Sequence, residues 1–177
     1  IASTGNAVDF GDTTAVRSSS SGVSSPVRGV LTGDNMLNMD FITIASTGNA
    51  QDFGDMTVVD WFLAAAASPT RAVFGNSDLG VQYVTISTLG NSAIGGTLPN
   101  GIRYCAHSNA VRAVFAGTNS YPDTWSVNIA SLGNAVEFGD MTSARNYNCS
   151  SGSATRGIIA GGYVSSSKDI MEKYEIM

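Results

Sequence analysis

The sequence repeats one unit of about 43 residues, and this periodicity constrains the fold more than any other feature. A recurrent Gly-Asn step places its glycine at intervals of 43, 42 and 43 residues, at Gly5, Gly48, Gly90 and Gly133. An arginine recurs at intervals of 43, 41 and 44 residues, at Arg28, Arg71, Arg112 and Arg156. Two landmarks that keep one period predict a single domain of four copies of one supersecondary unit, at approximately residues 1–43, 44–85, 86–128 and 129–177.

A period of this length is typical of helical arrays such as HEAT or armadillo repeats, and of the four-stranded blades of a β-propeller. Composition favours the propeller. Only 13% of the residues are charged, and Lys168 and Lys173 are the only lysines, whereas helical surfaces are usually rich in Lys and Glu. Segments 71–75 and 81–86 are β-branched and aromatic, and a Gly-Asn turn follows them. We therefore predict an all-β propeller with three or four short strands in each unit.

Each unit also contains a stretch of small residues, at 18–25, 64–68, 105–110 and 149–154. Strands that converge on a propeller axis have little lateral room, so small side chains suit the innermost position. We assign these stretches to the inner strands.

The repeat unit resembles the kelch repeat, in which a glycine pair follows one strand and an aromatic residue lies in the next. The resemblance is carried by segments such as Ile158–Gly162 and by strands such as Tyr83–Ile86. The string Gly-Asn-Ala-x-Asp-Phe-Gly-Asp is similar to kelch-like repeats in structural proteins of tailed phages of marine bacteria. The resemblance covers the whole chain, and it implies a virion or extracellular location without a cofactor or enzymatic chemistry.

Charge and hydropathy exclude two classes of partner. The net charge is −5 and the isoelectric point is near 4.6, whereas nucleic-acid binding depends on clustered Lys and Arg. The longest uncharged stretch, 79–102, contains Gln, Asn, Pro and several Gly, so it is unsuited to span a bilayer. We expect no nucleic-acid partner and no membrane insertion.

Three units contain two carboxylates spaced three residues apart, in the pairs Asp9 and Asp12, Asp52 and Asp55, and Glu137 and Asp140. Such pairs could bind calcium, but calcium takes six to eight oxygen ligands, so two carboxylates fall short. The alternative is a tight turn in which one Asp binds main-chain N–H groups and the Phe anchors the turn in the core. We favour the turn and predict no metal site.

The arginine column, Arg28, Arg71, Arg112 and Arg156, recurs at the same period as these carboxylates. We expect a structural column in which these arginines pair with carboxylates such as Asp12, Asp55 and Asp140, in their own or a neighbouring blade. A ring that binds an anion at the channel is the alternative. Arg17 lies outside the column, and we expect it to be exposed and to matter less for stability.

The chain offers no catalytic constellation. Cys105 and Cys149 occupy a column that holds Ser21 and Ala64 in the other units, so we expect free thiols that fill space. His107 is the only histidine, and no nucleophile motif accompanies it. A catalytic residue would have to break the repeat near the channel mouth, and only His107 and Asp60 do so.

Three aromatic residues, Tyr121, Trp125 and Tyr163, follow glycine-ended strands in the most variable part of the unit. Loops of this kind often carry binding in scaffolded repeat proteins, so these residues are the candidate binding residues, with ordinary packing as the alternative. The expected partners are other virion or assembly proteins, or a glycan or protein of a host surface.

The units begin and end at one point of the repeat. This phase is compatible with a four-bladed propeller closed by its first and last strands, or with a segment of a longer repeat protein, which we favour. We expect a non-enzymatic virion structural or host-adsorption module. The alternative is a secreted lectin-like propeller, although Trp61 and Trp125 lie in different phases of the repeat.

Overall fold

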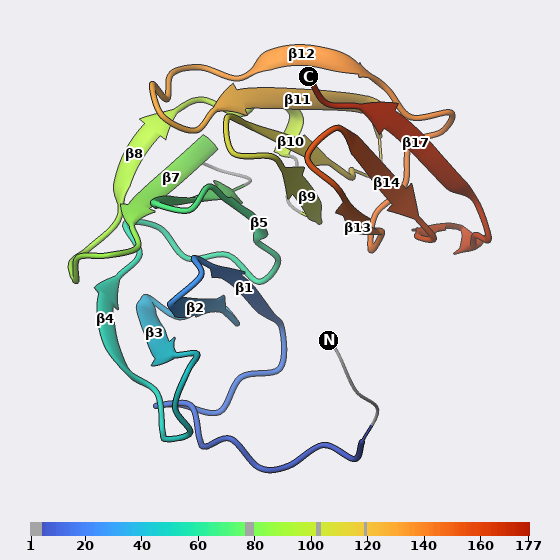
Figure 1. Ribbon diagram of the computed structural model, residues 1–177. Helices are drawn as coiled ribbons and strands as arrows, with labels where there is room; N and C mark the ends of the chain where they lie inside the picture. The colour runs from blue at the N-terminus through green and yellow to red at the C-terminus, as the bar shows by residue number, and fades with distance from the viewer. Residues whose placement is uncertain (1–4, 77–79, 102–103, 119) are drawn as a thin grey trace.

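The computed structural model describes residues 5–76, 80–101, 104–118 and 120–177. Within these ranges the chain forms β-strands and one 3-10 turn at Pro99–Gly101. The strands make four antiparallel sheets in a ring, the arrangement of a four-bladed β-propeller (Figure 1). The prediction of an all-β propeller with four repeat units is therefore confirmed. No helix in these ranges is long and apolar enough to cross a membrane.

The first three blades are four-stranded meanders whose strands pair in chain order. Blade one comprises β1 (Ser20–Ser24), β2 (Arg28–Gly33), β3 (Asn38–Thr43) and β4 (Gln51–Asp55). Blade two comprises β5 (Ala64–Ala67), β6 (Arg71–Asn76), β7 (Gly80–Thr85) and β8 (Ala93–Gly96). Blade three comprises β9 (Cys105–Ser108), β10 (Arg112–Ala116), β11 (Asp123–Asn128) and β12 (Val136–Asp140).

Blade four comprises β13 (Cys149–Gly152), β14 (Arg156–Ala160) and β17 (Met171–Glu175), in that order. A two-stranded hairpin of β15 (Tyr163–Val164) and β16 (Ser166–Ser167) lies between β14 and β17 in the chain. Each of the first three blades starts in one sequence unit and ends in the next, because its outer strand follows the Gly-Asn step of the next unit.

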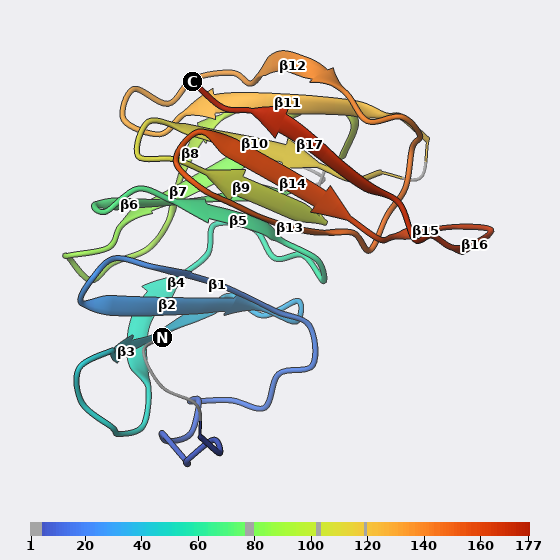
Figure 2. The same ribbon diagram turned by 45° about the vertical axis from the view of Figure 1, so that its right-hand side comes forward.

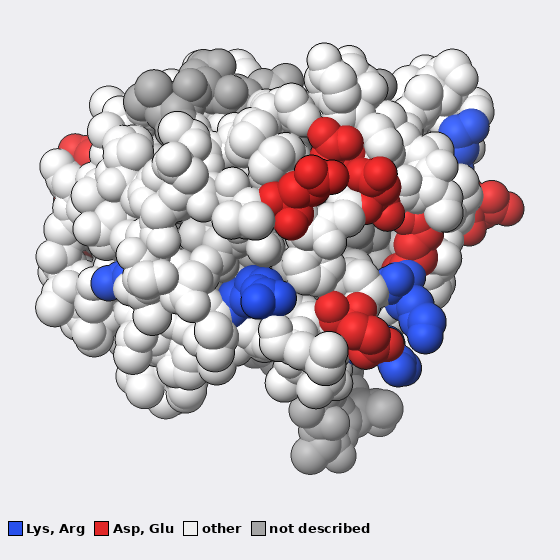
Figure 3. Space-filling view, turned by 90° about the horizontal axis from the view of Figure 1, so that it is seen from above, with Lys and Arg blue, Asp and Glu red and all other residues white. Residues whose placement is uncertain are grey.

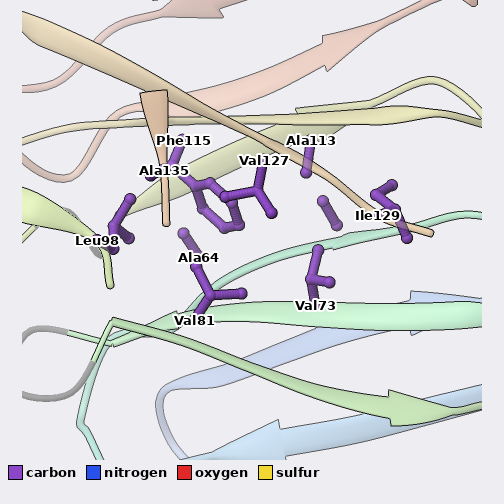
Figure 4. Close-up of a cluster of buried hydrophobic side chains, with 10 residues drawn as sticks. Ala64, Val73, Val81, Leu98, Ala113, Phe115, Val127, Ile129 and Ala135 are labelled. Carbon is purple, nitrogen blue, oxygen red and sulfur yellow. The ribbon is translucent and has the colours of Figure 1, made fainter. Parts of the chain in front are cut away.

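The hydrophobic core lies between the blades. Residues of blades two and three form one cluster, which Figure 4 shows around Phe115, Val73 and Val127. Alternate residues of the middle strand β6 face opposite neighbours, since Phe74 packs on blade one and Val73 on blade three. Both faces of β6 are therefore buried. For this reason its sequence contains a continuous apolar run and does not alternate between apolar and polar residues.

The small-residue stretches form the inner strands, as predicted. β1, β5, β9 and β13 are the first strands of the four sheets, and successive inner strands lie in contact. Small hydroxyl side chains link them, because Ser108 Oγ donates to Ala67 O at 2.8 Å and Ser150 Oγ donates to Ala106 O at 2.7 Å. A bulky residue in these strands would push neighbouring blades apart.

Neighbouring blades are also joined by a recurrent contact that we name the Gly-Asn clasp. The main-chain N–H of its glycine donates to a carbonyl of the preceding outer segment at 2.8 Å, in the pairs Gly48 to Phe10, Gly90 to Phe53 and Gly133 to Gly95. The next Asn accepts a hydrogen bond from a main-chain N–H through Oδ1, in the pairs Asn49 with Asp12, Asn91 with Asp55 and Asn134 with Thr97. A Cβ on Gly54 would lie 2.5 Å from the Gly90 carbonyl carbon, so the clasp requires glycine at this position.

Candidate functional site

The connections between strands divide the propeller into two faces. The turns between first and second strands, such as 25–27 and 109–111, lie on one face, which we name the turn face. The connections between second and third strands, and from one blade to the next, lie at the opposite ends of the strands. We name this opposite side the loop face.

The loop face carries a cluster of three aromatic rings near the axis. Phe62, Tyr104 and Tyr147 come one or two residues before β5, β9 and β13, so three blades each contribute one ring. The ring centroids lie 5.5 Å apart for Phe62 and Tyr104, 5.4 Å for Phe62 and Tyr147, and 5.0 Å for Tyr104 and Tyr147. Two of these pairs have the edge-to-face geometry that aromatic rings favour.

This aromatic cluster is accessible to a partner. Tyr147 is 57% exposed, and neighbouring Trp61 is 53% exposed. Tyr147 has φ of +52°, a conformation that costs energy for a non-glycine residue and is enriched at functional sites. The cluster was not predicted from the sequence, although an aromatic residue before the small-residue stretch in three of the four units was the available signal.

Two of the three predicted binding residues lie on the loop face. Tyr121 and Tyr163 are 50% and 46% exposed. The N–H of Tyr121 donates to Thr118 Oγ1 at 2.9 Å, and the N–H of Tyr163 donates to Asn146 O at 2.8 Å. Because Thr118 forms a β-bridge with Arg145, the residue before Asn146, the two tyrosines project from neighbouring segments.

Trp125 does not lie in a loop as expected, and the alternative of ordinary packing describes it. This residue lies within strand β11, opposite Phe115 of β10, and its ring packs against the core between blades two and three. Its Nε1 atom is buried and has no hydrogen-bond partner among the described residues. The strand that carries Trp125 begins at Asp123, directly after Pro122.

Two arginines of the column, Arg28 and Arg71, contact the next blade, and their partners differ from the predicted carboxylates. Arg28 Nη1 donates to Ile86 O at 2.7 Å, and its guanidinium lies 4.5 Å from the centre of the Phe41 ring. Arg71 repeats this arrangement one blade later, donating to Ile129 O at 2.9 Å and stacking on Tyr83. These two arginines therefore join blade one to blade two and blade two to blade three.

The two remaining arginines of the column differ from this pattern. Arg112 lies over the Phe138 ring at 5.9 Å, and Arg156 pairs with Glu175 at 3.0 Å on the surface. The side chains of Asp12, Asp55 and Asp140 are exposed and are not the partners of these arginines. Arg28 and Arg71 bind carbonyls, Arg112 lies over a ring and Arg156 pairs with a carboxylate, so the four guanidinium groups do not share one kind of partner as an anion-binding ring would require.

The Asp-Phe-Gly-Asp motif lies in an outer strand with a bulge, as in β4, and not in a turn. The predicted bond from a main-chain N–H to the first Asp is present, because Gly11 donates to Asp9 Oδ1 and Gly54 donates to Asp52 Oδ1, both at 3.1 Å. Phe53 is buried in the core as predicted, whereas Phe10 is 36% exposed. No group of three or more His, Cys, Asp or Glu in the described ranges is placed to hold a metal ion.

The turn face is hollowed around the axis. A cavity of about 530 Å³ is lined by the four turns that link first and second strands, with His107 at one side. His107 Nε2 lies 3.0 Å from Ser153 O, so a main-chain group satisfies the histidine. Asp60, the other departure from the repeat, is buried elsewhere and accepts a bond from the N–H of Phe62.

Both cysteines are free, as predicted. Cys105 is buried in β9, and this burial raises the pKa of its thiol to about 12. Cys149 is exposed at the start of β13.

Charged side chains are unevenly spread over the face shown in Figure 3. Acidic and basic groups gather on the half of this face where β17 lies, and most of the remaining surface is uncharged.

Comparison with protein-family models and with curated proteins finds no match for this sequence.

Proposed function

We propose that this protein is a non-enzymatic binding or structural module that contacts its partner through the loop face. The observation that carries this proposal is the exposed aromatic surface there. It is made by the cluster of Phe62, Tyr104 and Tyr147 together with Tyr121 and Tyr163. Exposed Tyr side chains provide large contact area at low entropic cost, so they are enriched at interfaces.

The rigidity of the scaffold supports the same proposal. Hydrogen bonds hold described parts of the segments that carry Tyr121 and Tyr163, such as the bonds of Thr118 to Tyr121 and of Asn146 to Tyr163. The core between blades holds the segments in place. Prearranged contact groups lose less entropy on binding, which raises affinity.

We further propose that the module is a structural or host-adsorption part of a phage virion, with other virion proteins or a host-surface glycan or protein as its partner. The resemblance of the repeat to kelch-like units of phage structural proteins motivates this step. Differences among the units are concentrated in the connections of the loop face, whereas the Gly-Asn steps are nearly constant. Variation of this kind suits recognition of a surface through many weak contacts.

The first test locates the polypeptide by mass spectrometry in purified phage particles that encode it. Antibodies raised against loop-face peptides, such as 117–122, should block adsorption of these particles, whereas antibodies against turn-face peptides such as 108–112 should not. Absence of the polypeptide from the particles would reject the virion assignment.

A second test separates protein partners from sugars. The purified protein is passed over a glycan array and over intact host cells, as wild type and as the variants Tyr147→Ser and Tyr121→Ser. Val111→Ser is the matched control, because Val111 is also exposed but lies on the turn face. Loss of cell binding in the tyrosine variants alone supports the loop face, and specific retention on one class of glycan would favour the lectin-like alternative. Equal binding by all variants would contradict the proposal.

A further inference from the structure

The fourth blade ends in an unpaired strand edge. β17 pairs with β14 on one side, and in the described part of the chain no strand pairs with its other side. The N–H of Ile176 donates to Thr155 O, next to β14, at 2.9 Å. Since bonding direction alternates along an antiparallel strand, Met171, Lys173 and Glu175 direct their main-chain polar groups away from β14. Such an edge is a template for another strand.

A small cavity lies beside this edge. This cavity of about 120 Å³ is lined by Phe138–Met141 from β12 and the residue after it, by Ile159, and by Glu172–Tyr174 of β17. The equivalent place in blade two is filled by Ser92, the residue that follows a Gly-Asn step. Ser92 is buried there, and its Oγ lies 2.7 Å from Thr57 N and 2.9 Å from Gln82 Oε1.

Residues 5–12 have the sequence that fits this place. Gly5 and Asn6 form the first Gly-Asn step, and Ala7 follows it as Ser92 follows Asn91. The next five residues, Val-Asp-Phe-Gly-Asp, differ at one position each from β12, Val-Glu-Phe-Gly-Asp, and from β4, Gln-Asp-Phe-Gly-Asp.

Gly11 in residues 5–12 shares the backbone conformation of the matching glycine in the outer strands. Gly11 has φ of +144°, beside +135° for Gly54 in β4 and +149° for Gly139 in β12. One side of the segment already makes a clasp, with Gly48 and Asn49 of blade one. Both ribbon views place it against blade one and away from β17 (Figures 1 and 2). Its second side is therefore available for pairing.

We propose that the edge formed by β12 and β17 docks residues 5–12 of a second copy of this chain, so that copies join head to tail. Val8–Asp12 of the second copy becomes the fourth strand of blade four. Its Gly5 and Asn6 clasp Phe138–Asp140, where a Cβ on Gly139 meets nothing within 4 Å. Ala7 enters the cavity between β12 and β17. The same contacts that join blades within the chain then join two chains, independently of the proposed function.

The pairing register follows from the other blades. Thr124 pairs with Gly139 and Trp125 with Glu137, with a bulge between these pairs. The corresponding pairs in the new interface are Met171 with Gly11 and Glu172 with Asp9. Although Glu172 and Asp9 are paired in this register, their carboxylates do not face each other. The Glu172 carboxylate is held within its own chain by Arg145 and Thr142. Asp40 in blade one likewise bonds inward to Arg17 while Asp52 lies opposite.

Docking also covers apolar surface that the single chain leaves exposed. Val8 is 87% exposed and Met171 is 71% exposed in the single chain. In the proposed interface, Val8 of one copy and Met171 of the other both lie in the newly paired strands. Phe10 is expected to become buried in the way that Phe53 is buried at 2% exposure in β4. Removing these side chains from water favours association. The two partner surfaces differ, so the contact is heterologous and can propagate beyond a dimer.

Analytical ultracentrifugation over a concentration series tests the proposal on the 177-residue chain. The average mass of the wild type should rise with concentration. Ala7→Arg should raise the dissociation constant at least about tenfold, because the larger side chain does not fit the cavity. Lys173→Pro should do the same, since it removes an N–H that faces away from β14. Ala110→Arg, an equal change at an exposed turn-face position, should associate like the wild type.

Mixing the two interface variants identifies the mode of association. Each variant retains one intact partner surface, so an equimolar mixture should form a dimer and stop there. A wild type that stays monomeric throughout would overturn the proposal, and protection of the β17 amides from hydrogen exchange in that monomer would show pairing within one chain. Association that both variants leave unchanged would also overturn it. Thermal unfolding of each variant checks that the blades remain folded.

Discussion

Arg17 and Asp40 form an ion pair inside blade one, with Arg17 Nη2 3.3 Å from Asp40 Oδ1 and side-chain exposures of 3% and 0%. Thr14 N–H donates to Asp40 Oδ2 at 3.0 Å, and Arg17 Nη2 donates to Asn38 O at 3.0 Å. The expectation that Arg17 is exposed was therefore wrong. The pair ties the segment that precedes β1 to the third strand of the same blade.

The arrangement recurs in blade four, where Arg145 Nη1 lies 3.0 Å from Glu172 Oε1 and Thr142 N–H donates to the same oxygen at 3.1 Å. In both blades the Thr and the Arg follow the Asp of the Asp-Phe-Gly-Asp or Glu-Phe-Gly-Asp motif by two and five residues. Blade two replaces the carboxylate with Gln82, whose Oε1 accepts a bond from Thr57 N–H at 2.9 Å. A buried polar anchor thus fixes the connection that enters the first strand of blades one and four.

Replacement of Arg17 by Ala is expected to lower the free energy of unfolding by about 3 to 5 kcal/mol, because it leaves the Asp40 carboxylate buried without its partner. Arg156→Ala is the control, since its pair with Glu175 is about half exposed on both sides and contributes about 0 to 1 kcal/mol. Urea unfolding followed by tryptophan fluorescence measures both variants. Equal losses of unfolding free energy in the two variants would show that the Arg17–Asp40 pair does not stabilise blade one more than a surface pair does.

Stability should fall in acid partly through Glu172. Burial alone would raise the pKa of this carboxyl, but hydrogen bonds from Thr142 and Arg145 outweigh it and lower the pKa below the ordinary 4.5. A group whose pKa is lower in the folded state stabilises the fold above its unfolded value, and this contribution is lost as the pH falls through the folded value. The wild type should therefore be more stable than Glu172→Gln at neutral pH, and the gap in melting temperature should narrow in acid. A constant gap across the titration would contradict this assignment.

The two thiols should differ sharply in reactivity. At pH 8 a thiol reagent is expected to label Cys149 in the folded protein and both cysteines in denaturant, because burial holds Cys105 protonated. The pKa of the Cys105 thiol is about 12 in the folded protein, above the ordinary 9.0. The buried neutral thiol therefore contributes its full share of stability below pH 9, and this share is lost as the pH rises from 9 towards 12. Mass spectrometry of the labelled protein gives the count. Labelling of Cys105 at the rate of Cys149 in the native state would refute the burial.

Gly54 and Gly139 form a matched pair for the clasp. They have similar φ values of +135° and +149°, but a Cβ on Gly54 meets the Gly90 main chain at 2.5 Å and a Cβ on Gly139 meets nothing within 4 Å. Backbone strain costs about 1 to 3 kcal/mol at either position. Gly54→Ala should therefore destabilise clearly more than Gly139→Ala in thermal unfolding of dilute protein. Similar losses would indicate that strain alone decides, without the close approach of blades.

The sequence by itself determined the repeat, its strand content and the inner position of the small residues. These properties follow from local rules, because turn residues, β-branched runs and crowding at an axis leave a periodic signal. The recurrence of the arginine column was also visible in the sequence. Its partners were not, because Arg28 contacts Ile86 and Arg71 contacts Ile129, which belong to the next blade in each case.

Only the tertiary structure decided which groups meet across blades. The aromatic cluster joins Phe62, Tyr104 and Tyr147 from three blades, and Trp125 enters the core because the strand that carries it is covered on that face. The buried pair of Arg17 and Asp40 likewise joins residues 23 positions apart through the meander of blade one. Contacts of this kind depend on the angle and spacing between sheets, and these are set by core packing between blades that a single repeat unit does not encode.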